Sequence, residues 1–144
     1  MSVMPWVMRP YSTSDEGFVV YSWLKSFSRS RIGRAWVQAE GWSGYWAGHR
    51  PHVLRVVHRT QILCMPDSSD VILGWVAGTD ELLHYALCKR TLHEERLAAE
   101  AFCFMLGDRL NRAQTLTHEQ CDLQDVRESI TPPRMWTLNP YRLL

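Results

Sequence analysis

The chain has 144 residues, 46% of them hydrophobic and 22% charged, and a formal net charge of +1. This length suits one domain with a real core, and the near-neutral charge argues against nucleic acid or a membrane surface as partner. No apolar run approaches the roughly 20 residues of a membrane span, and no charged start precedes an apolar core as in a secretory signal. We therefore expect a single cytoplasmic domain over 1–144.

The four cysteines are widely spaced and form no CxxC pair, which indicates reduced thiols. Cys64 and Cys88 fall in expected strands and Cys103 falls in an expected helix. In such positions a free cysteine usually acts as a small apolar residue.

The N-terminal part predicts an edge strand over 3–9, interrupted by Pro5, and then a helix over 14–28. Thr13 and Glu16 have the spacing of a capping box. Apolar residues at helical spacing predict the buried side of this helix: Val20, Trp23, Leu24 and Phe27.

A basic loop is expected at 29–34, followed by a short or broken helix, because Gly41, Gly44 and Gly48 all weaken helices. Trp42 and Trp46 lie four residues apart and would share one face of it. Pro51 suits the first turn of a further helix that ends near Arg59. The expected buried side of that helix is Val53, Val56 and Val57.

Three strands, at 61–65, 71–77 and 82–88, are separated by tight turns and predict an antiparallel meander. A long helix over 91–107 follows, and its expected buried stripe is Leu97, Ala98, Ala101, Phe104 and Met105. The remainder suggests a strand at 114–118, a small helix near 123–130 and a last extended segment from 135 to 144. The sequence thus predicts an α+β domain, with a mixed sheet and helices on both faces. The crossover from 82 to 118 would make two strands parallel.

This order of elements resembles the GNAT fold of the GCN5-related N-acetyltransferases over essentially the whole chain. The strongest matching pieces are MRPYSTSDEGFVVYSWLKSF, VILGWVAG with LLHYALCKR, and WTLNPYRLL. Together these pieces resemble small GNAT-like proteins of tailed bacteriophages. The resemblance implies a mostly antiparallel sheet with one splayed parallel pair, formed here by 82–88 and 114–118.

The resemblance also implies acetyl-CoA or a related acyl-CoA as cofactor. Backbone groups near Ala86, Leu87 and Cys88 would bind the pantetheine arm and polarise the thioester, which an amine would attack with the help of a general base. The pyrophosphate would lie at the start of the following helix, where free N–H groups and the positive end of the helix dipole suit an anion.

The family's pyrophosphate signature aligns with six residues, of which only the last matches: His93, Glu94, Glu95, Arg96, Leu97 and Ala98. Arg96 replaces a glycine, and His93 replaces an arginine or glutamine. Thr91 and Glu94 have capping-box spacing and would occupy helix N–H groups that a phosphate needs. Glu94 and Glu95 would repel the anion, while Lys89, Arg90 and Arg96 would offset part of that repulsion.

Four residues are candidates for acid–base catalysis: His84, Glu81, His118 and Tyr141. His84 could be a general base or a hydrogen-bonded sheet residue, and Glu81 a base of the kind GNATs use or a solvated turn residue. His118 ends the next expected strand, near the amine entrance. By the resemblance Tyr141 could be an acid toward the leaving thiolate, although tyrosine at such a position is more often a C-terminal packing residue.

Other chemistry has little support in the sequence. His49 and His52 lie three apart without an evident third ligand, so no metal site is expected. There is no GxSxG motif, and nothing links a serine or cysteine to a histidine.

The expected function is a phage-type N-acyltransferase that modifies an amine of a host metabolite or protein in the host cytoplasm. The alternative is a catalytically degenerate protein that keeps the fold and modulates a host enzyme by direct contact. A third hypothesis uses the basic, aromatic region 29–59 to bind nucleic acid. Aromatic residues in such a region are more often core, and its arginines a solvated rim.

Overall fold

The computed structural model describes residues 5–79, 82–107, 115–116 and 137–138, the last two pairs as backbone only. Four strands form an antiparallel sheet in the order β1 (Val7–Pro10), β2 (Thr60–Cys64), β3 (Gly74–Gly78) and β4 (Leu82–Cys88). The two-residue strands β5 (Thr115–Leu116) and β6 (Thr137–Leu138) continue this sheet in parallel register. The α+β class and the antiparallel meander are therefore confirmed, whereas the splayed pair of a GNAT sheet stays a prediction.

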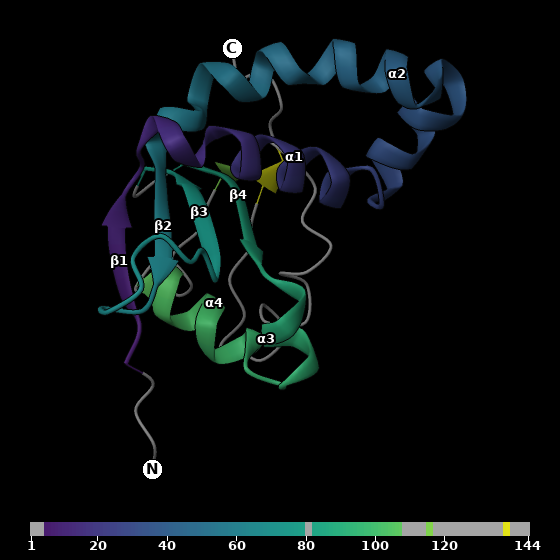
Figure 1. Cartoon of the computed structure of the whole chain (residues 1–144). Coiled ribbons are helices and arrows are strands. Elements are labelled where there is room, and N and C mark those ends of the chain that lie inside the picture. The colour runs from purple at the N-terminus through teal and green to yellow at the C-terminus, as the bar shows by residue number, and fades with distance from the viewer. Residues whose placement is uncertain (1–4, 80–81, 108–114, 117–136, 139–144) are drawn as a thin grey trace.

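Helices cover both faces of the sheet (Figure 1). On one face lie α1 (Glu16–Phe27) and α2 (Arg31–Val56), with the short 3₁₀ helices η1 (Thr13–Asp15) and η2 (Val57–Arg59) at their ends. On the other face lies α4 (Ala98–Leu106), which follows the short helix α3 (Arg90–Glu94). Among the described residues, no helix is both long and apolar enough to cross a membrane.

The core beneath α1 is built from aromatic rings. Trp23 lies 5.3 Å from Trp75 of β3 and 5.6 Å from Tyr85 of β4, between ring centroids. The buried residues of α1 include the whole stripe expected from the sequence, so that prediction is confirmed: Val20, Trp23, Leu24 and Phe27. The expected buried side near the end of α2 is confirmed as well: Val53, Val56 and Val57.

The start of α1 differs in detail from the prediction, because the helix begins two residues after 14. The capping acid is Asp15, whose carboxylate accepts a 2.8 Å hydrogen bond from the Ser12 backbone N–H. Arg9 of β1 holds the same carboxylate through two bonds of 2.8 Å. The predicted capping box of Thr13 and Glu16 is therefore wrong by one residue. The box is formed by Ser12 and Asp15, because the ion pair with Arg9 holds Asp15 in place.

The expected basic loop at 29–34 is wrong, because α2 already begins at Arg31. Ser30 caps it by accepting a 3.0 Å hydrogen bond from the Gly33 N–H. The expected break is real but occurs only at Gly41, whose φ of 74° interrupts the helix. The chain reverses there, so the two limbs of α2 run back along each other (Figure 1). Pro51 lies inside the second limb and does not begin a new helix.

The predicted helix over 91–107 is two helices. Arg96 has a left-handed φ of 61°, the Leu97 N–H bonds to the Leu92 carbonyl at 2.8 Å, and the Arg96 N–H bonds to the His93 carbonyl at 3.1 Å. This is a Schellman motif that ends α3. The break shifts the buried face of α4, so Phe102 and Leu106 are buried whereas Phe104 is 45% exposed, contrary to the predicted stripe. The expected apolar role of Cys103 is also wrong, because that side chain is exposed.

The second meander strand begins at Gly74, three residues later than expected. Its pairing with β4 shifts where Ala77 faces Tyr85 and Gly78 faces Leu83, which places His84 at a β-bulge. A Cβ on Gly78, where φ is 147°, would lie 2.2 Å from the Leu82 carbonyl oxygen. Only glycine fits this close approach, so Gly78 fixes the irregular start of β4.

Candidate functional site

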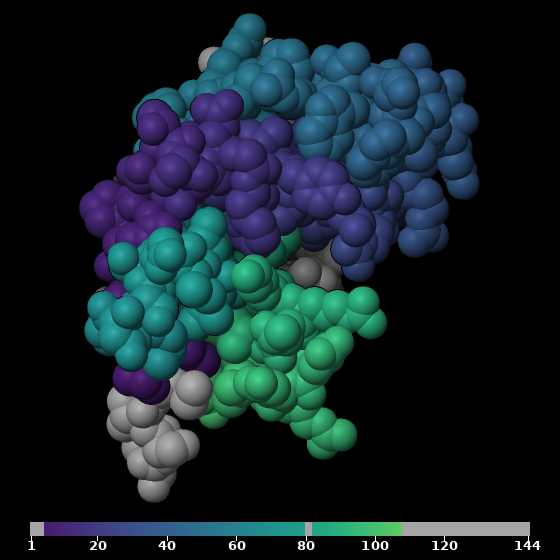
Figure 2. All heavy atoms as spheres, viewed as in Figure 1, coloured from purple at the N-terminus to yellow at the C-terminus, as the bar shows by residue number. Residues whose placement is uncertain are grey.

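A pocket of about 760 Å³ opens between α1 and the carboxyl end of β4. We call it the α1–β4 pocket. Its described lining comes from α1, the end of β4 and the residues that follow β4: Phe18, Tyr21, Ser22, Lys25, Ser26, Arg29, Leu87, Cys88, Lys89, Arg90 and His93. Figure 2 shows the surface hollowed between the purple atoms of α1 and the green atoms after β4.

Four cationic side chains border this pocket: Lys25, Arg29, Lys89 and Arg90. No carboxylate occurs among its described lining residues. Cations gathered where no carboxylate lines the pocket raise the local concentration of anions, and arginine and lysine are the usual ligands of phosphate. The pocket is therefore suited to an anion, and phosphate is the chemistry that these side chains recognise best.

Part of the cationic border is set by helical spacing on α1. Ser22, Lys25 and Ser26 lie at i, i+3 and i+4 on one face of α1, and Arg29 follows in the turn after Phe27, the last residue of the helix. The sequence interpretation concentrated on the junction after β4 and missed this stripe. The signal that would have found it is the polar face next to the apolar face of Val20, Trp23 and Leu24.

The wall of the pocket is fixed by hydrogen bonds to core aromatic residues. The Ser26 and Tyr85 hydroxyl oxygens are 2.6 Å apart, and the Trp75 Nε1–H donates to the Ser22 hydroxyl at 3.0 Å. Ser22 in turn donates to the Phe18 carbonyl at 2.7 Å. These bonds connect α1 to β3 and β4, so the polar side of α1 cannot move independently of the sheet.

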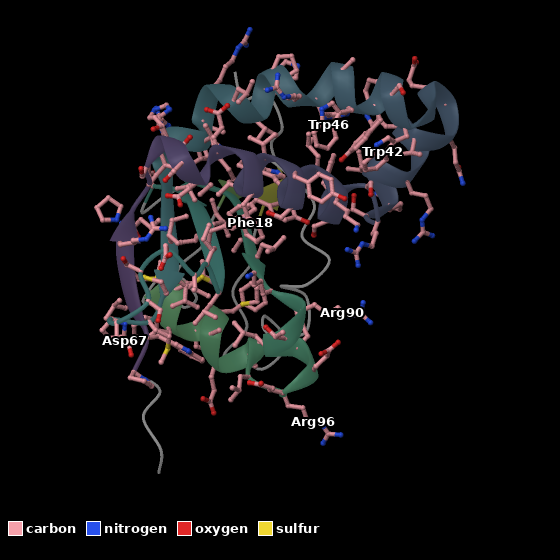
Figure 3. All side chains as sticks on the ribbon, viewed as in Figure 1. Phe18, Trp42, Trp46, Asp67, Arg90 and Arg96 are labelled. Carbon is pink, nitrogen blue, oxygen red and sulfur yellow. The ribbon has the colours of Figure 1, made fainter. Side chains whose placement is uncertain are left out.

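Phe18 and Lys89 close one end of the pocket, where the Lys89 ammonium lies 5.5 Å from the centroid of the Phe18 ring. Figure 3 shows Phe18 between α1 and the sheet. The same two residues border a second hollow of about 750 Å³ on the side of Arg9 and Ser69. Lys89 is thus held at the boundary of two hollows by a cation–π contact.

Three of the residues expected to bind cofactor reach the α1–β4 pocket: Leu87, Cys88 and His93. Ala86 instead packs in the core under α4. Glu95 and Arg96 are exposed at the α3–α4 turn, with Arg96 directed away from the body of the protein (Figure 3). Leu97 and Ala98 pack partly against the core under α4. The aligned pyrophosphate signature therefore covers a helix end and a turn, and only its first residue lines the pocket.

The expected capping box of Thr91 and Glu94 is wrong. Lys89 is the N-cap of α3, without a side-chain capping bond, and Thr91 lies inside the helix. Glu94 instead pairs with Arg90 at 3.0 Å, and both side chains are largely exposed. The pair partly offsets a cation of the pocket, although an exposed i,i+4 pair contributes little to stability.

The catalytic candidates lie in different settings. His84 is fully buried in the sheet, at the β-bulge of β4, and is absent from the pocket lining. Glu81, His118 and Tyr141 lie outside the described residues, so their roles stay predictions. Among the described residues that line the pocket, His93 is the only histidine.

His49 and His52 lie on the second limb of α2, and no group of three potential metal ligands occurs in the described part of the chain. The His49 ring contacts Trp36 and Tyr45, each at 4.9 Å between centroids. Burial, with a smaller contribution from His52, lowers the pKa of His49. This histidine is therefore part of the packing between the limbs of α2.

The fold and the pocket together define an α+β domain with a hollow, bordered by cationic side chains, between its first helix and the end of a central strand. The chain matches no protein-family model, no curated protein and no solved structure. Its function must therefore be argued from its own residues.

Proposed function

We propose that the chain is a GNAT-like N-acyltransferase that binds acetyl-CoA or a related acyl-CoA in the α1–β4 pocket. The observation that carries this proposal is the gathering of Lys25, Arg29, Lys89 and Arg90 at the end of β4 without a carboxylate in the described lining. Coenzyme A carries three phosphate groups, and this border supplies cations for them. The sequence resemblance independently expects the cofactor beside this strand.

The thioester end of the cofactor would lie deeper, near Leu87 and Cys88, which reach the pocket from β4. In the reaction the amine nitrogen forms a bond to the thioester carbonyl carbon, and the carbon–sulfur bond breaks. The amine loses a proton to a general base, and the departing thiolate takes up a proton. The Ser26 hydroxyl, bonded to Tyr85, is an O–H group at the pocket wall that suits this second transfer.

The acceptor would be an amine of a host metabolite or protein, as expected for a phage-type protein. The carboxylate of Glu94 limits binding of the cofactor, because it pairs with Arg90 and competes with a phosphate for the guanidinium. Replacing Glu94 by glutamine is therefore expected to tighten cofactor binding.

A titration with acetyl-CoA, followed by thermal denaturation, tests the proposal. A ligand at 100 times its Kd stabilises the folded state by about 2.7 kcal/mol, so saturating acetyl-CoA should raise the Tm clearly. The double variant Lys25→Glu, Arg29→Glu should lose this shift. Arg55→Glu is the matched control, because Arg55 is exposed on α2 and does not line the pocket. An unchanged Tm at millimolar acetyl-CoA would exclude the acyltransferase.

A second candidate function is docking on a host enzyme without catalysis. It is favoured by the exposure of large aromatic side chains on α1 and α2, where Tyr21 is 51%, Trp36 45% and Trp42 44% exposed. Exposed tryptophan and tyrosine are typical anchors of protein interfaces. A docking protein should retain one host protein through washing, and Trp36→Ala or Trp42→Ala should release it. Full capture by both variants would exclude docking through this surface.

A further inference from the structure

Next to the α1–β4 pocket lies a smaller hollow of about 350 Å³ whose walls are aromatic. We call it the aromatic groove, and its described lining is Tyr21, Trp42, Ser43 and Trp46. The Trp42 and Trp46 rings lie 5.9 Å apart and the Tyr21 and Trp46 rings 6.0 Å apart, between centroids. Figure 3 shows both tryptophans on the side of α2 that faces α1.

The rings of the groove are held in place by neighbouring side chains. Trp42 and Trp46 are one helical turn apart on the second limb of α2, so their side chains meet. Trp42 also contacts Tyr45, at 5.5 Å, and the Tyr45 hydroxyl donates to the Leu24 carbonyl of α1. Rings held in this way lose little conformational freedom when a ligand stacks on them.

Tyr21 belongs to both the aromatic groove and the α1–β4 pocket, so the two hollows adjoin. The Lys25 ammonium lies 5.6 Å from the centre of the Tyr21 ring, at the boundary between them. One ligand can therefore place a flat ring in the groove and a charged group in the pocket. The occupant of the groove must be compatible with the charges of Lys25 and Arg29 beside it.

Aromatic walls bind either a cation or a flat, uncharged ring. The neighbouring cations repel a positively charged guest and attract one that carries an anion. A flat ring attached to phosphate satisfies both hollows, and this is the chemistry of a nucleoside phosphate. Base stacking on aromatic side chains tolerates any base, because every base has a π-face.

We propose that the aromatic groove binds the base of a nucleoside phosphate whose phosphates occupy the α1–β4 pocket. The inference shares that pocket with the proposed function and rests on it in this respect, since coenzyme A is one member of the class. It goes further in assigning the nucleotide end of the ligand to Tyr21, Trp42 and Trp46. It also assigns the anchoring of that end to α1 and α2, elements that precede β4 in the chain.

The test measures binding of four probes to the full chain by isothermal titration: acetyl-CoA, adenosine 3′,5′-bisphosphate, adenosine and inorganic pyrophosphate. Adenosine 3′,5′-bisphosphate should bind more tightly than adenosine or pyrophosphate alone. Trp42→Ala should weaken binding of the bisphosphate about fivefold or more, because stacking on one aromatic ring supplies that much or more. Pyrophosphate binding should not change in this variant.

Two further variants distinguish a loss of ring stacking from a loss of folding. Trp42→Phe keeps a ring in the groove and should retain most of the affinity. Trp36→Ala removes a tryptophan of similar exposure that does not line the groove, and it should bind the bisphosphate as the unchanged chain does. Circular dichroism establishes that all three variants are folded.

The possible outcomes separate the inference from the proposed function. Binding of the bisphosphate with loss in Trp42→Ala supports the inference, even if acetyl-CoA does not bind and the acyltransferase is excluded. Equal binding of acetyl-CoA by Trp42→Ala and the unchanged chain overturns the inference and leaves the acyltransferase standing. Absence of bisphosphate binding at millimolar concentration overturns the inference, and capture of a host protein by the same residues would then identify the groove as a docking surface.

Discussion

The two faces of the sheet bury different kinds of side chain. Under α1 and α2 the core contains Trp23, Trp75, Tyr85 and Tyr45. Under α4 it is mostly aliphatic, with Trp6 and Phe102 as its aromatic residues. Tyrosine and tryptophan have an apolar body and one polar group that needs a partner. For Trp75, Tyr85 and Tyr45 those partners are Ser22, Ser26 and the Leu24 carbonyl, in that order, and both serines line the α1–β4 pocket. The face with a hydrogen-bonded aromatic core is therefore the face that carries the pocket.

The largest expected effect comes from removing the central ring of the α1 side. Trp23 is fully buried between Trp75 and Tyr85, so Trp23→Ala should lower the free energy of unfolding by about 3–5 kcal/mol. Urea denaturation measures this loss. Trp36→Ala is the matched control and should cost less than about 1 kcal/mol, because Trp36 is exposed. Similar losses in the two variants would contradict the described core.

The ion pair between β1 and η1 joins the sheet to α1 and should come next. Hydrogen bonds from Arg9 hold the pKa of Asp15 below its usual value of 3.8, against the opposing effect of burial. The resulting stabilisation is complete above that value and is lost as the pH falls through the lower pKa of the folded state. Asp15→Asn should cost about 1–3 kcal/mol at neutral pH.

Urea denaturation across pH 2–7 checks this prediction, and the variant should lose less stability in acid than the unchanged chain. Asp67→Asn serves as control, since Asp67 is exposed in the connection between β2 and β3 (Figure 3). If Asp67→Asn flattened the acid profile as much as Asp15→Asn, the assignment to Asp15 would be wrong.

A smaller effect should identify the polar contacts of the α1 side. Ser26→Ala removes a partner of the buried Tyr85 hydroxyl and should cost about 1–2 kcal/mol. A double-mutant cycle with Tyr85→Phe should give a coupling energy of about 0.5–1.5 kcal/mol, because the two hydroxyl groups contact each other directly. Ser14→Ala, at an exposed position, should be nearly neutral. Strict additivity of Ser26→Ala and Tyr85→Phe would mean that the bond contributes nothing.

The smallest effect concerns the turn that precedes α4 and has the opposite sign. Arg96 adopts a left-handed φ of 61° at the position where helices usually place glycine. Arg96→Gly should therefore stabilise the fold by up to about 1 kcal/mol, measured by thermal or urea denaturation. Thr91→Gly, inside α3, should instead destabilise by a few tenths of a kcal/mol. A loss of stability in Arg96→Gly would show that its side chain makes a contact worth more than the strain.

The sequence predicted the elements whose periodicity agrees with their packing. The stripe of α1 and the valines near the end of α2 are buried as expected, because apolar spacing and tertiary contact favour the same helix. The length of α2 was missed, since glycine weakens a helix by only about 1 kcal/mol and burial of Tyr45, Val53 and Val56 outweighs that cost. The split between α3 and α4 was missed because a Schellman turn with arginine lacks its usual glycine.

Some residues that line the α1–β4 pocket were singled out from the sequence, and their role in binding a cofactor stays a prediction. Leu87, Cys88 and His93 were expected to contact the cofactor, and they lie together in the α1–β4 pocket. Lys25 was overlooked because a cation on an exposed helix face is usually only solvated, and Arg29 was assigned only to a basic loop. Their importance depends on what lies opposite, and the spacing of residues within α1 does not contain that information. Contacts between distant segments, such as Ser26 with Tyr85, likewise follow from the folded chain alone.

The backbone conformation of Gly41, where α2 reverses, selects the handedness of any residue that replaces this glycine. Its φ of 74° and ψ of 169° are the mirror image of an extended conformation that ordinary residues adopt readily. Nothing lies within 4 Å of the place where a Cβ would stand, so the position has room for a methyl group and rejects only its handedness. A D-alanine introduced there by chemical synthesis should be accepted, whereas its L-enantiomer should swing Trp42 and Trp46 away from Tyr21.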